Sequence, residues 1–261
     1  MDEGTVNTGQ PNGIRRCSED DSGMFRSVRR WIHDAMASVF PSSCLCCGGR
    51  LLGGEQYVCA SCLGSWPYPT LITDPKDNLF VRRFWGTVSA VNGITVFNYF
   101  PQGEMKNVIH DMKYRHQADL CRFMGRVMGS KELVRSMLCE ADCLIPVPIT
   151  EQRRQERGYN QSELLCEGIS SITGTPVVTE ALLRTKFQDS QTTLNEAMRR
   201  ENVVDAFALG DTTKIEGKHV VIVDDIVTTG STLLECMFVM KDVPGIKISV
   251  LSLGWTAGHW R

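Results

Sequence analysis

One segment of the chain places two carboxylates and several hydroxyls directly after an apolar run. Val220–Val223 are branched apolar residues and predict a strand buried on both faces. Asp224 and Asp225 follow, and adjacent carboxylates at the carboxyl end of a strand accept hydrogen bonds from sugar hydroxyls or hold a hydrated Mg²⁺. The turn that comes next offers hydroxyls and backbone N–H groups at a helix start, which suits a phosphate. Its residues are Thr228, Thr229, Gly230, Ser231 and Thr232.

Three other structures share part of this pattern. A Walker B strand also ends in acidic residues, but it needs a partner G-x4-G-K-[ST] motif, which the sequence lacks. A receiver domain has paired acidic residues but no hydroxyl-rich turn immediately after them. An ordinary buried strand followed by a Thr or Ser helix cap remains open as an alternative.

Four cysteines have the spacing of a metal site. Cys44 and Cys47 form one C-x2-C pair, eleven residues follow, and Cys59 and Cys62 form the second. Four thiolates in tetrahedral array suit Zn²⁺, and such a closed site makes the metal structural. Reduced free cysteines and a redox dithiol are the alternatives, although no thioredoxin-like unit is visible. Cys46 could compete as a ligand, but the gap between Cys44 and Cys47 matches that of the second pair.

Basic residues elsewhere could meet a phosphate. Arg153, Arg154 and Arg157 follow an expected strand, and guanidinium groups bind phosphate oxygens in pairs of hydrogen bonds. A solvated charged helix is the alternative. We single out Arg157 because Gly158 follows it at a helix break. Lys113 ends a predicted helix, where it either reaches a phosphate or faces solvent.

The elements that must position these residues alternate between short apolar runs and helical stretches, which predicts an α/β protein with a parallel sheet. Strands are expected at 87–99, with a turn at Asn92–Gly93, and helices over 103–140, with breaks near Gly125 and Gly129. Later strands are expected at 143–147, 203–209, 219–223 and 246–253, and later helices at 162–173 and 233–241.

The expected organisation has five parts. Residues 1–24 form a disordered tail, 25–66 an amphipathic helix and the cysteine module, and 67–86 a linker. A main domain covers 87–255, and 256–261 form a C-terminal tail.

Composition limits the class of protein. Lys plus Arg is 28 and Asp plus Glu is 30, which gives a net charge of −2 and excludes a uniformly basic nucleic-acid binder. No apolar run is long enough for a membrane span, and no secretory signal precedes the first helix. With 11 cysteines and no export signal, a disulfide framework is not expected. We therefore expect a cytoplasmic protein without stable membrane insertion.

The segment VVIVDDIVTTGST (220–232) resembles the signature with which type I phosphoribosyltransferases bind 5-phosphoribosyl 1-pyrophosphate (PRPP). The whole chain, over about residues 25–253, resembles the ComF family, phosphoribosyltransferase-like competence proteins with an N-terminal zinc finger. The stretches that carry this resemblance are FPSSCLCCG (40–48), VIHDMKYR (108–115), IPVPITEQRRQERGYNQSELL (145–165), and Gln191, Leu194 and Asn202. The long polar tail and the additional Cys46 depart from the family pattern.

The resemblance implies a type I phosphoribosyltransferase-like parallel sheet flanked by helices and preceded by a small zinc-ribbon-like module. It implies that Asp224 and Asp225 contact the ribose hydroxyls and that the turn 228–232 holds the 5′-phosphate. We add Lys113 and Arg157 as catalytic candidates. In this fold the polar stretch 183–200 holds a mobile loop, where Arg184 and Lys186 could neutralise pyrophosphate.

Two functions follow. The first is a protein that binds PRPP or a related ribose 5-phosphate ligand with Mg²⁺ and transfers the phosphoribosyl group to an acceptor that the sequence does not reveal. The second is a non-catalytic, nucleotide-sensing competence factor that binds single-stranded DNA. Structural Zn²⁺ is expected in both cases, and the competence machinery is an expected partner.

Overall fold

The structure is a computed structural model, and it describes residues 43–69, 72–86, 88, 90–185 and 206–256. All of them belong to one compact unit, Ser43–Arg261. The expected tail at 1–24, the expected helix at 25–40, and Lys186, Gln191, Leu194 and Asn202 lie outside the described residues.

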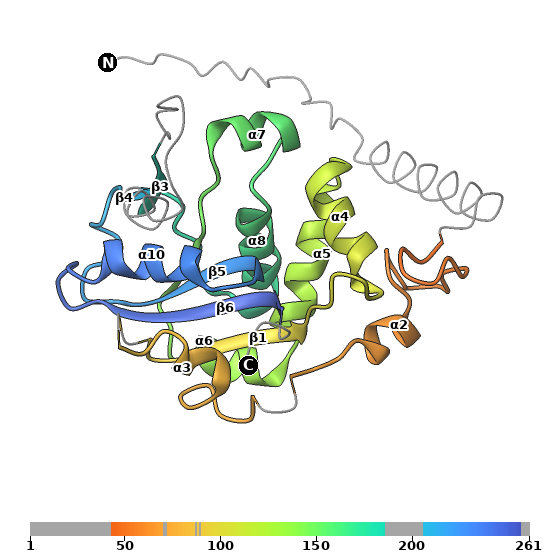
Figure 1. Cartoon of the computed structure of the whole chain (residues 1–261), viewed down its shortest axis with the longest axis horizontal. Coiled ribbons are helices and arrows are strands. Elements are labelled where there is room, and N and C mark those ends of the chain that lie inside the picture. Colours follow the sequence, from red (N-terminus) through yellow and green to blue (C-terminus); the bar gives the residue numbers. More distant parts are fainter. Residues whose placement is uncertain (1–42, 70–71, 87, 89, 186–205, 257–261) are drawn as a thin grey trace, which may run out of the picture. The chain divides into compact units, whose positions relative to one another are not determined.

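Four parallel strands form the central sheet, in the order β1–β6–β5–β2 (Figure 1). The strands are β1 (Gly93–Asn98), β2 (Cys143–Pro146), β5 (His219–Val227) and β6 (Lys247–Trp255). The expected parallel α/β sheet is therefore confirmed. Strand β5 is longer than predicted, because it continues through Asp224 and Asp225 to Val227.

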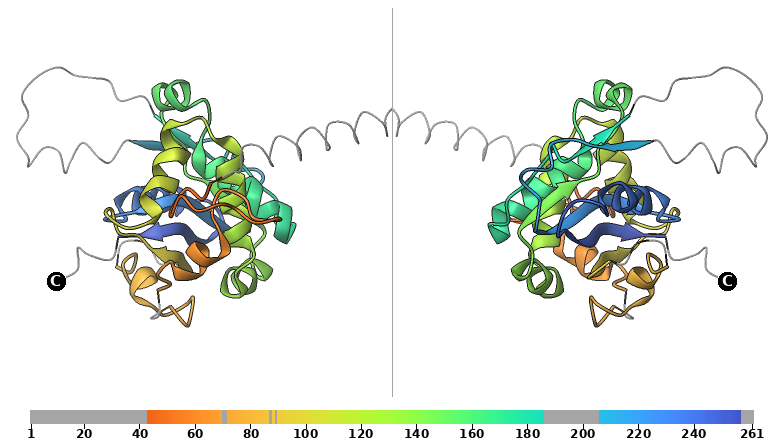
Figure 2. Two further views of the ribbon diagram at one scale, coloured as in Figure 1. Left: turned by 90° about the vertical axis from the view of Figure 1, so that its right-hand side faces the viewer. Right: turned by 90° about the vertical axis from the view of Figure 1, so that its left-hand side faces the viewer.

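Helices cover both faces of this sheet (Figure 2). Val221 and Val223 of β5 pack into one apolar core, and Val220 and Ile222 pack into a second one. Residues 220–223 of this strand therefore need apolar side chains at every position. The first core includes α4 (Met105–Tyr114), α5 (Ala118–Gly129), α6 (Glu132–Cys139) and α8 (Gln161–Thr173), and the second includes α3 (Leu79–Arg82) and α10 (Ser231–Met240).

Helix α5 runs through Gly125 without the expected break, and it ends at Gly129, where the second break was expected. The reason is its contact with α8: a Cβ atom on Gly125 would lie 2.2 Å from the carbonyl oxygen of Leu165. The glycine allows two helices to approach closely, and it does not end one.

The region before β1 also differs from the prediction. Asn92–Gly93 is not a hairpin turn, because β1 begins at Gly93 and pairs only with β6 in the described sheet. The expected linker at 67–86 contains α3, where Phe80 and Val81 are fully buried. A Cβ atom on Gly93 would lie 2.9 Å from that of Val81, so this glycine serves close packing of α3 on β1.

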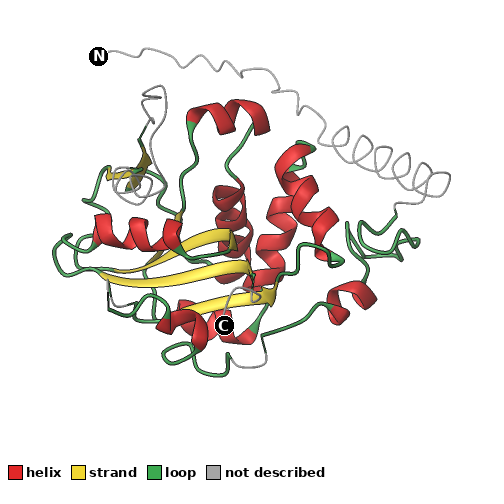
Figure 3. Cartoon of the chain, viewed as in Figure 1, coloured by secondary structure: helices red, strands yellow, loops and turns green. Residues whose placement is uncertain are grey.

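Two short strands and two short helices complete the described part (Figure 3). Strands β3 (Leu182–Arg184) and β4 (Phe207–Leu209) form an antiparallel pair, so the strand expected at 203–209 joins a separate two-stranded sheet. Helix α7 (Glu151–Arg157) buries none of its residues, and α2 (Ala60–Ser65) begins within the second cysteine pair, with Cys59 as its N-cap and Cys62 in its first turn. None of the helices in the described ranges has the length and apolar character that crossing a bilayer requires.

Candidate functional site

A cavity of about 320 Å³ lies where β2 and β5 approach their carboxyl ends. Ligands in open α/β sheets bind at this edge. The residues after β2, helix α7, the end of α4, the start of α8 and the acidic end of β5 form its walls. Arg184 of β3 and Thr232 of α10 complete the lining, so the cavity collects residues from seven elements and loops of the chain.

Both predicted acids line the cavity, and each has a partner. The ammonium of Lys113, at the end of α4, lies 2.8 Å from Oδ2 of Asp225. Asp224 accepts hydrogen bonds from Oγ of Ser162 at 3.3 Å and from the backbone N–H of Asp225 at 2.9 Å. Burial, together with the neighbouring carboxylate of Asp225, raises the pKa of Asp224 to about 7. Close to neutral pH, Asp224 is therefore able to accept or to donate a proton.

The hydroxyl turn lies beside the acids and begins α10. Of its residues only Thr232 belongs to the cavity lining. Thr228, Thr229 and Ser231 are exposed, and Gly230 is buried with φ of 82°. Nε of Arg83 donates to the carbonyl oxygen of Thr229 at 2.6 Å, which ties the turn to the end of α3.

Four cationic side chains line the same cavity. They are Lys113, Arg153, Arg157 and Arg184. Arg154, the remaining arginine of the predicted group, pairs with Glu163 and is absent from the lining. The structure thus brings Arg153 and Arg157 to the candidate site and leaves Arg154 outside it.

Arg184 comes from β3 and is partly buried. Its guanidinium lies 4.3 Å from the ring centroid of Phe207, and its Nε is buried with no hydrogen-bond partner among the described residues. Burial lowers the pKa of Arg184. A buried donor without a partner is costly, so this side chain is suited to an anion in the cavity.

Sequence reasoning did not identify Gln161 and Ser162 as site residues. Both lie in the first turn of α8, both are buried, and both line the cavity. Ser162 is 62 positions from its partner Asp224. A polar start to a helix was the only signal in the sequence, and it does not indicate which strand the helix packs against.

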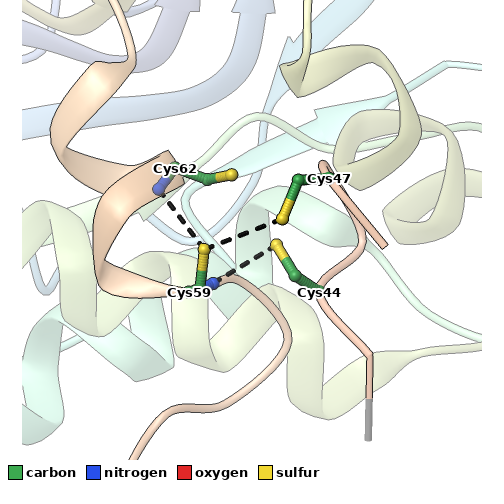
Figure 4. Close-up of side chains that lie close together, drawn as sticks. All are labelled: Cys44, Cys47, Cys59 and Cys62. Carbon is green, nitrogen blue, oxygen red and sulfur yellow. Dashed lines mark hydrogen bonds between the residues drawn. The ribbon is translucent and has the colours of Figure 1, made fainter. Parts of the chain in front are cut away.

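The four predicted cysteines form a second site. Their side chains point toward one another (Figure 4), and all four Sγ atoms lie within 4.8 Å of one another. A tetrahedral centre with Zn–S bonds of about 2.3 Å places its sulfurs about 3.8 Å apart. The observed separation of 4.0 Å between the Sγ atoms of Cys47 and Cys59 is close to that value. These four residues could therefore hold a metal ion, and Cys46 is not part of the group.

Backbone N–H groups donate hydrogen bonds to sulfur atoms of this cluster and so stabilise a negatively charged thiolate. The N–H of Cys59 donates to Sγ of Cys44 at 3.3 Å, and the N–H of Cys62 donates to Sγ of Cys59 at 3.4 Å. Burial raises the pKa of Cys44, but backbone N–H donors, first that of Cys59, outweigh it and lower the pKa to about 6. The fold therefore favours a thiolate at Cys44, whereas burial and the neighbouring cysteines raise the pKa of Cys62.

The cysteine cluster shares its core with the sheet. Cys44 and Cys62 belong to the same apolar cluster as Met105 of α4 and Val221 of β5. Nδ2 of Asn107, also on α4, donates to the carbonyl oxygen of Leu45 at 3.1 Å. Helix α4 therefore contacts the cysteine loop near its start and carries Lys113 near its end.

Comparison with known protein families first identifies the class of domain. Residues 172–251 match the family model "Phosphoribosyl transferase domain". This range contains the acid-bearing strand β5 and helix α10. The fold is therefore that of a phosphoribosyltransferase-type α/β domain, with the cysteine cluster preceding it.

Individual relatives narrow the class further. The chain is 31% identical to Competence protein F of Haemophilus influenzae over 231 residues, which cover 84% of this chain and 99% of that protein. It is 31% identical to Competence protein ComFC of Bacillus subtilis over 70% of this chain and 67% of that protein. DNA utilization protein YhgH of Escherichia coli O157:H7 is 34% identical over 145 residues, 54% of this chain. The matched part spans 62% of the length of that last relative. The chain belongs to the ComF family of competence proteins, as its sequence motifs predicted.

Proposed function

We propose that the cavity binds PRPP or a related ribose 5-phosphate ligand together with Mg²⁺. The observation that carries the proposal is the convergence of Asp224, Asp225 and Thr232 with the four cations in one cavity. Such a cavity offers acceptors for sugar hydroxyls and donors for phosphate oxygens at the same place. A ligand with only one of these groups would leave part of the lining unused.

The proposed roles follow the geometry. Asp224 and Asp225 accept hydrogen bonds from the ribose hydroxyls, and the turn 228–232 holds the 5′-phosphate with its hydroxyl and N–H groups. Lys113 and Arg157 bind the anionic group on C1. When bound, Mg²⁺ would neutralise negative charge on the diphosphate. The oxygen-rich acidic end of β5 fits such a hard cation.

If the protein is a transferase, a nucleophile attacks C1 of the ribose and forms a bond to it. The bond between C1 and the diphosphate oxygen breaks, and pyrophosphate leaves with the electron pair. The protein contributes mainly position and charge neutralisation. Asp224 lines the same cavity, and burial and Asp225 raise its pKa to about 7, so it is the candidate for taking the proton of the nucleophile near neutral pH.

The second candidate is a non-catalytic factor that senses a nucleotide and binds single-stranded DNA. The ring of Tyr114 favours it, because that side chain is 63% exposed and lies 5.7 Å from the guanidinium of Arg157. Exposed aromatic rings beside arginines are typical surfaces for unpaired bases. The names of the relatives, which refer to competence and to DNA utilization, agree with such a role.

Three further assignments belong to the same proposal. The four cysteines hold a structural Zn²⁺, the protein acts in the cytoplasm, and it works with the competence machinery.

Titration distinguishes the two functions. The full-length protein is titrated with PRPP and Mg²⁺, and separately with a single-stranded oligonucleotide at two salt concentrations. Release of pyrophosphate is then measured with a panel of nucleobases as acceptors. Turnover supports the transferase, and PRPP binding without turnover supports the sensing factor. DNA binding with a steep salt dependence supports the nucleic-acid role. Absence of PRPP binding rejects the ribose-phosphate assignment.

A further inference from the structure

Gln161 is a buried amide that joins two walls of the cavity. The residue is 2% exposed and is the first residue of α8. Its Oε1 accepts a hydrogen bond from Nη1 of Arg157 at 2.8 Å, and its Nε2 donates to the carbonyl oxygen of Met112 at 3.3 Å. Met112 directly precedes Lys113 in α4, so one side chain contacts both the arginine of α7 and the end of the helix that carries the lysine.

The two contacts define how the amide must point. A guanidinium has only donors, so the oxygen of Gln161 has to face Arg157. A carbonyl only accepts, so the NH₂ group has to face Met112. No other uncharged side chain of this length offers one acceptor and one donor in this arrangement, which explains the residue type from its surroundings.

The side chain that accepts the hydrogen bond from Arg157 is uncharged, and this distinguishes Arg157 from neighbouring arginines. Arg154 on the same short helix pairs with the carboxylate of Glu163, and Arg122 pairs with Glu167. Arg157 contacts a neutral amide and the ring of Tyr114 instead, and no ion pair joins it to a carboxylate within the part of the chain that the structure describes. An amide orients a guanidinium without cancelling its charge, whereas a carboxylate would do both.

We propose that Gln161 is a positioning residue: it holds the guanidinium of Arg157 at the cavity while leaving its positive charge available for an anionic ligand group. This inference rests on the proposed function in one respect, that the cavity binds an anion. It adds the reason why an amide, and not an acid, lies beneath Arg157. Among the three arginines of α7, it also distinguishes Arg154, which anchors the helix through Glu163, from Arg157, which serves the ligand.

Two substitutions separate orientation from charge. Gln161→Glu keeps an acceptor for Arg157 but adds a carboxylate that neutralises it. Gln161→Met has nearly the same shape, loses both hydrogen bonds, and leaves the charge of Arg157 in place. Both variants lose the hydrogen bond to Met112, so the free energy of unfolding of each is measured beside its affinity. If Gln161 only supported the fold, the loss of affinity in each variant would follow its loss of stability, whereas the proposal predicts that Gln161→Glu weakens binding more than Gln161→Met at comparable stability.

The experiment measures affinity for inorganic pyrophosphate and for PRPP by titration calorimetry, at two salt concentrations, with the full-length protein. Gln161→Glu should weaken binding about ten- to hundred-fold, the value of a lost charge-assisted contact, and should flatten its salt dependence. Gln161→Met should weaken it only about two- to five-fold, a lost neutral hydrogen bond, and keep the salt dependence. Gln155→Glu is the matched control, because it adds the same charge at an exposed position of α7 and should change affinity less than about twofold.

A double-mutant cycle distinguishes an effect that acts through Arg157 from a loss of affinity caused only by reduced stability. In an Arg157→Gln background, adding Gln161→Glu should cause a clearly smaller further loss, since no guanidinium is left to neutralise and only the direct repulsion between the new carboxylate and the ligand remains. An equal loss with and without Arg157 would overturn the proposal, and so would a milder effect of Gln161→Glu than of Gln161→Met.

The use of both pyrophosphate and PRPP distinguishes failure of the Gln161 proposal from failure of the proposed function. Binding of pyrophosphate without binding of PRPP rejects the ribose-phosphate function but still tests Gln161. Binding of neither probe rejects both.

Discussion

Replacing Asp224 by asparagine should stabilise the free protein at alkaline pH while removing ligand binding. Asparagine keeps the shape of the side chain and an oxygen that accepts from Ser162 and from the N–H of Asp225, as the carboxylate does. It removes only the charge that burial and the carboxylate of Asp225 disfavour. Function and stability should therefore change in opposite directions at this position.

The size and sign of the effect follow from the pKa of Asp224, which burial first and Asp225 second raise from 3.8 to about 7. Between these two values the folded state holds a proton that the unfolded state has released. Stability consequently falls as the pH rises through this window, and the loss is nearly complete by about pH 8. Each pH unit is worth about 1.4 kcal/mol, which gives a total cost on the order of 2–4 kcal/mol. The asparagine side chain does not titrate, so the Asp224→Asn variant avoids this cost.

The assay is urea denaturation of the wild type and of Asp224→Asn at pH 5 and pH 8, without ligand. The advantage of the variant should grow by roughly 2 kcal/mol from the lower to the higher pH. Asp242→Asn, at an exposed position just after α10, is the control and should show no such growth. If Asp224→Asn is less stable than the wild type at pH 8, or if its advantage does not depend on pH, the reasoning about this carboxylate is refuted.

Three further changes have definite expected outcomes. Cys59→Ser should lower the melting temperature of the whole unit by about 5 °C or more in one calorimetric transition, because the cysteine cluster shares a core with the sheet. Two separate transitions would instead show that the cysteine module unfolds independently. Lys113→Met should cost about 1–3 kcal/mol in urea denaturation at pH 7 by leaving Asp225 unpaired, and combining it with Asp225→Asn should recover most of this loss; an additive double variant would contradict the pairing. Gly125→Ala should destabilise the protein by about 2 kcal/mol or more, because its Cβ atom would lie 2.2 Å from the carbonyl oxygen of Leu165; an unchanged denaturation midpoint would show that α5 and α8 separate easily.

Local patterns predicted the parts of the molecule that depend on neighbouring residues. The spacing of the two cysteine pairs predicted their cluster, because each C-x2-C segment brings its own thiolates together. The apolar run before Asp224 predicted a central strand, since both of its faces had to be buried. The predicted strand ended at Val223, which is too early. Asp224 and Asp225 lie at the carboxyl end of the sheet but still belong to the strand, which continues to Val227.

The contacts that complete the cavity could not be predicted in this way. Lys113 and Arg184 were candidates by residue type and resemblance, but the sequence did not show that they meet Ser162 and the two acids in one cavity. They reach it from the end of α4 and from the two-stranded sheet, and Ser162 reaches it from the start of α8. The sequence around each of these residues does not specify where its side chain lies in the fold. Their positions result from tertiary packing, such as that of α4 and α8 on the sheet. The glycines Gly93 and Gly125 were misinterpreted for the same reason, because a turn and a close helix contact require the same residue type.

The measurement that tests the central claim most directly is calorimetric titration of PRPP with Mg²⁺ into the wild type and into the Asp224→Asn/Asp225→Asn double variant. The wild type should bind, and the double variant, although folded, should lose at least about a hundredfold in affinity, because two charge-assisted contacts to the ribose hydroxyls disappear. Equal affinity of the two proteins, or no binding to the wild type, would contradict the assignment of this cavity to a ribose phosphate.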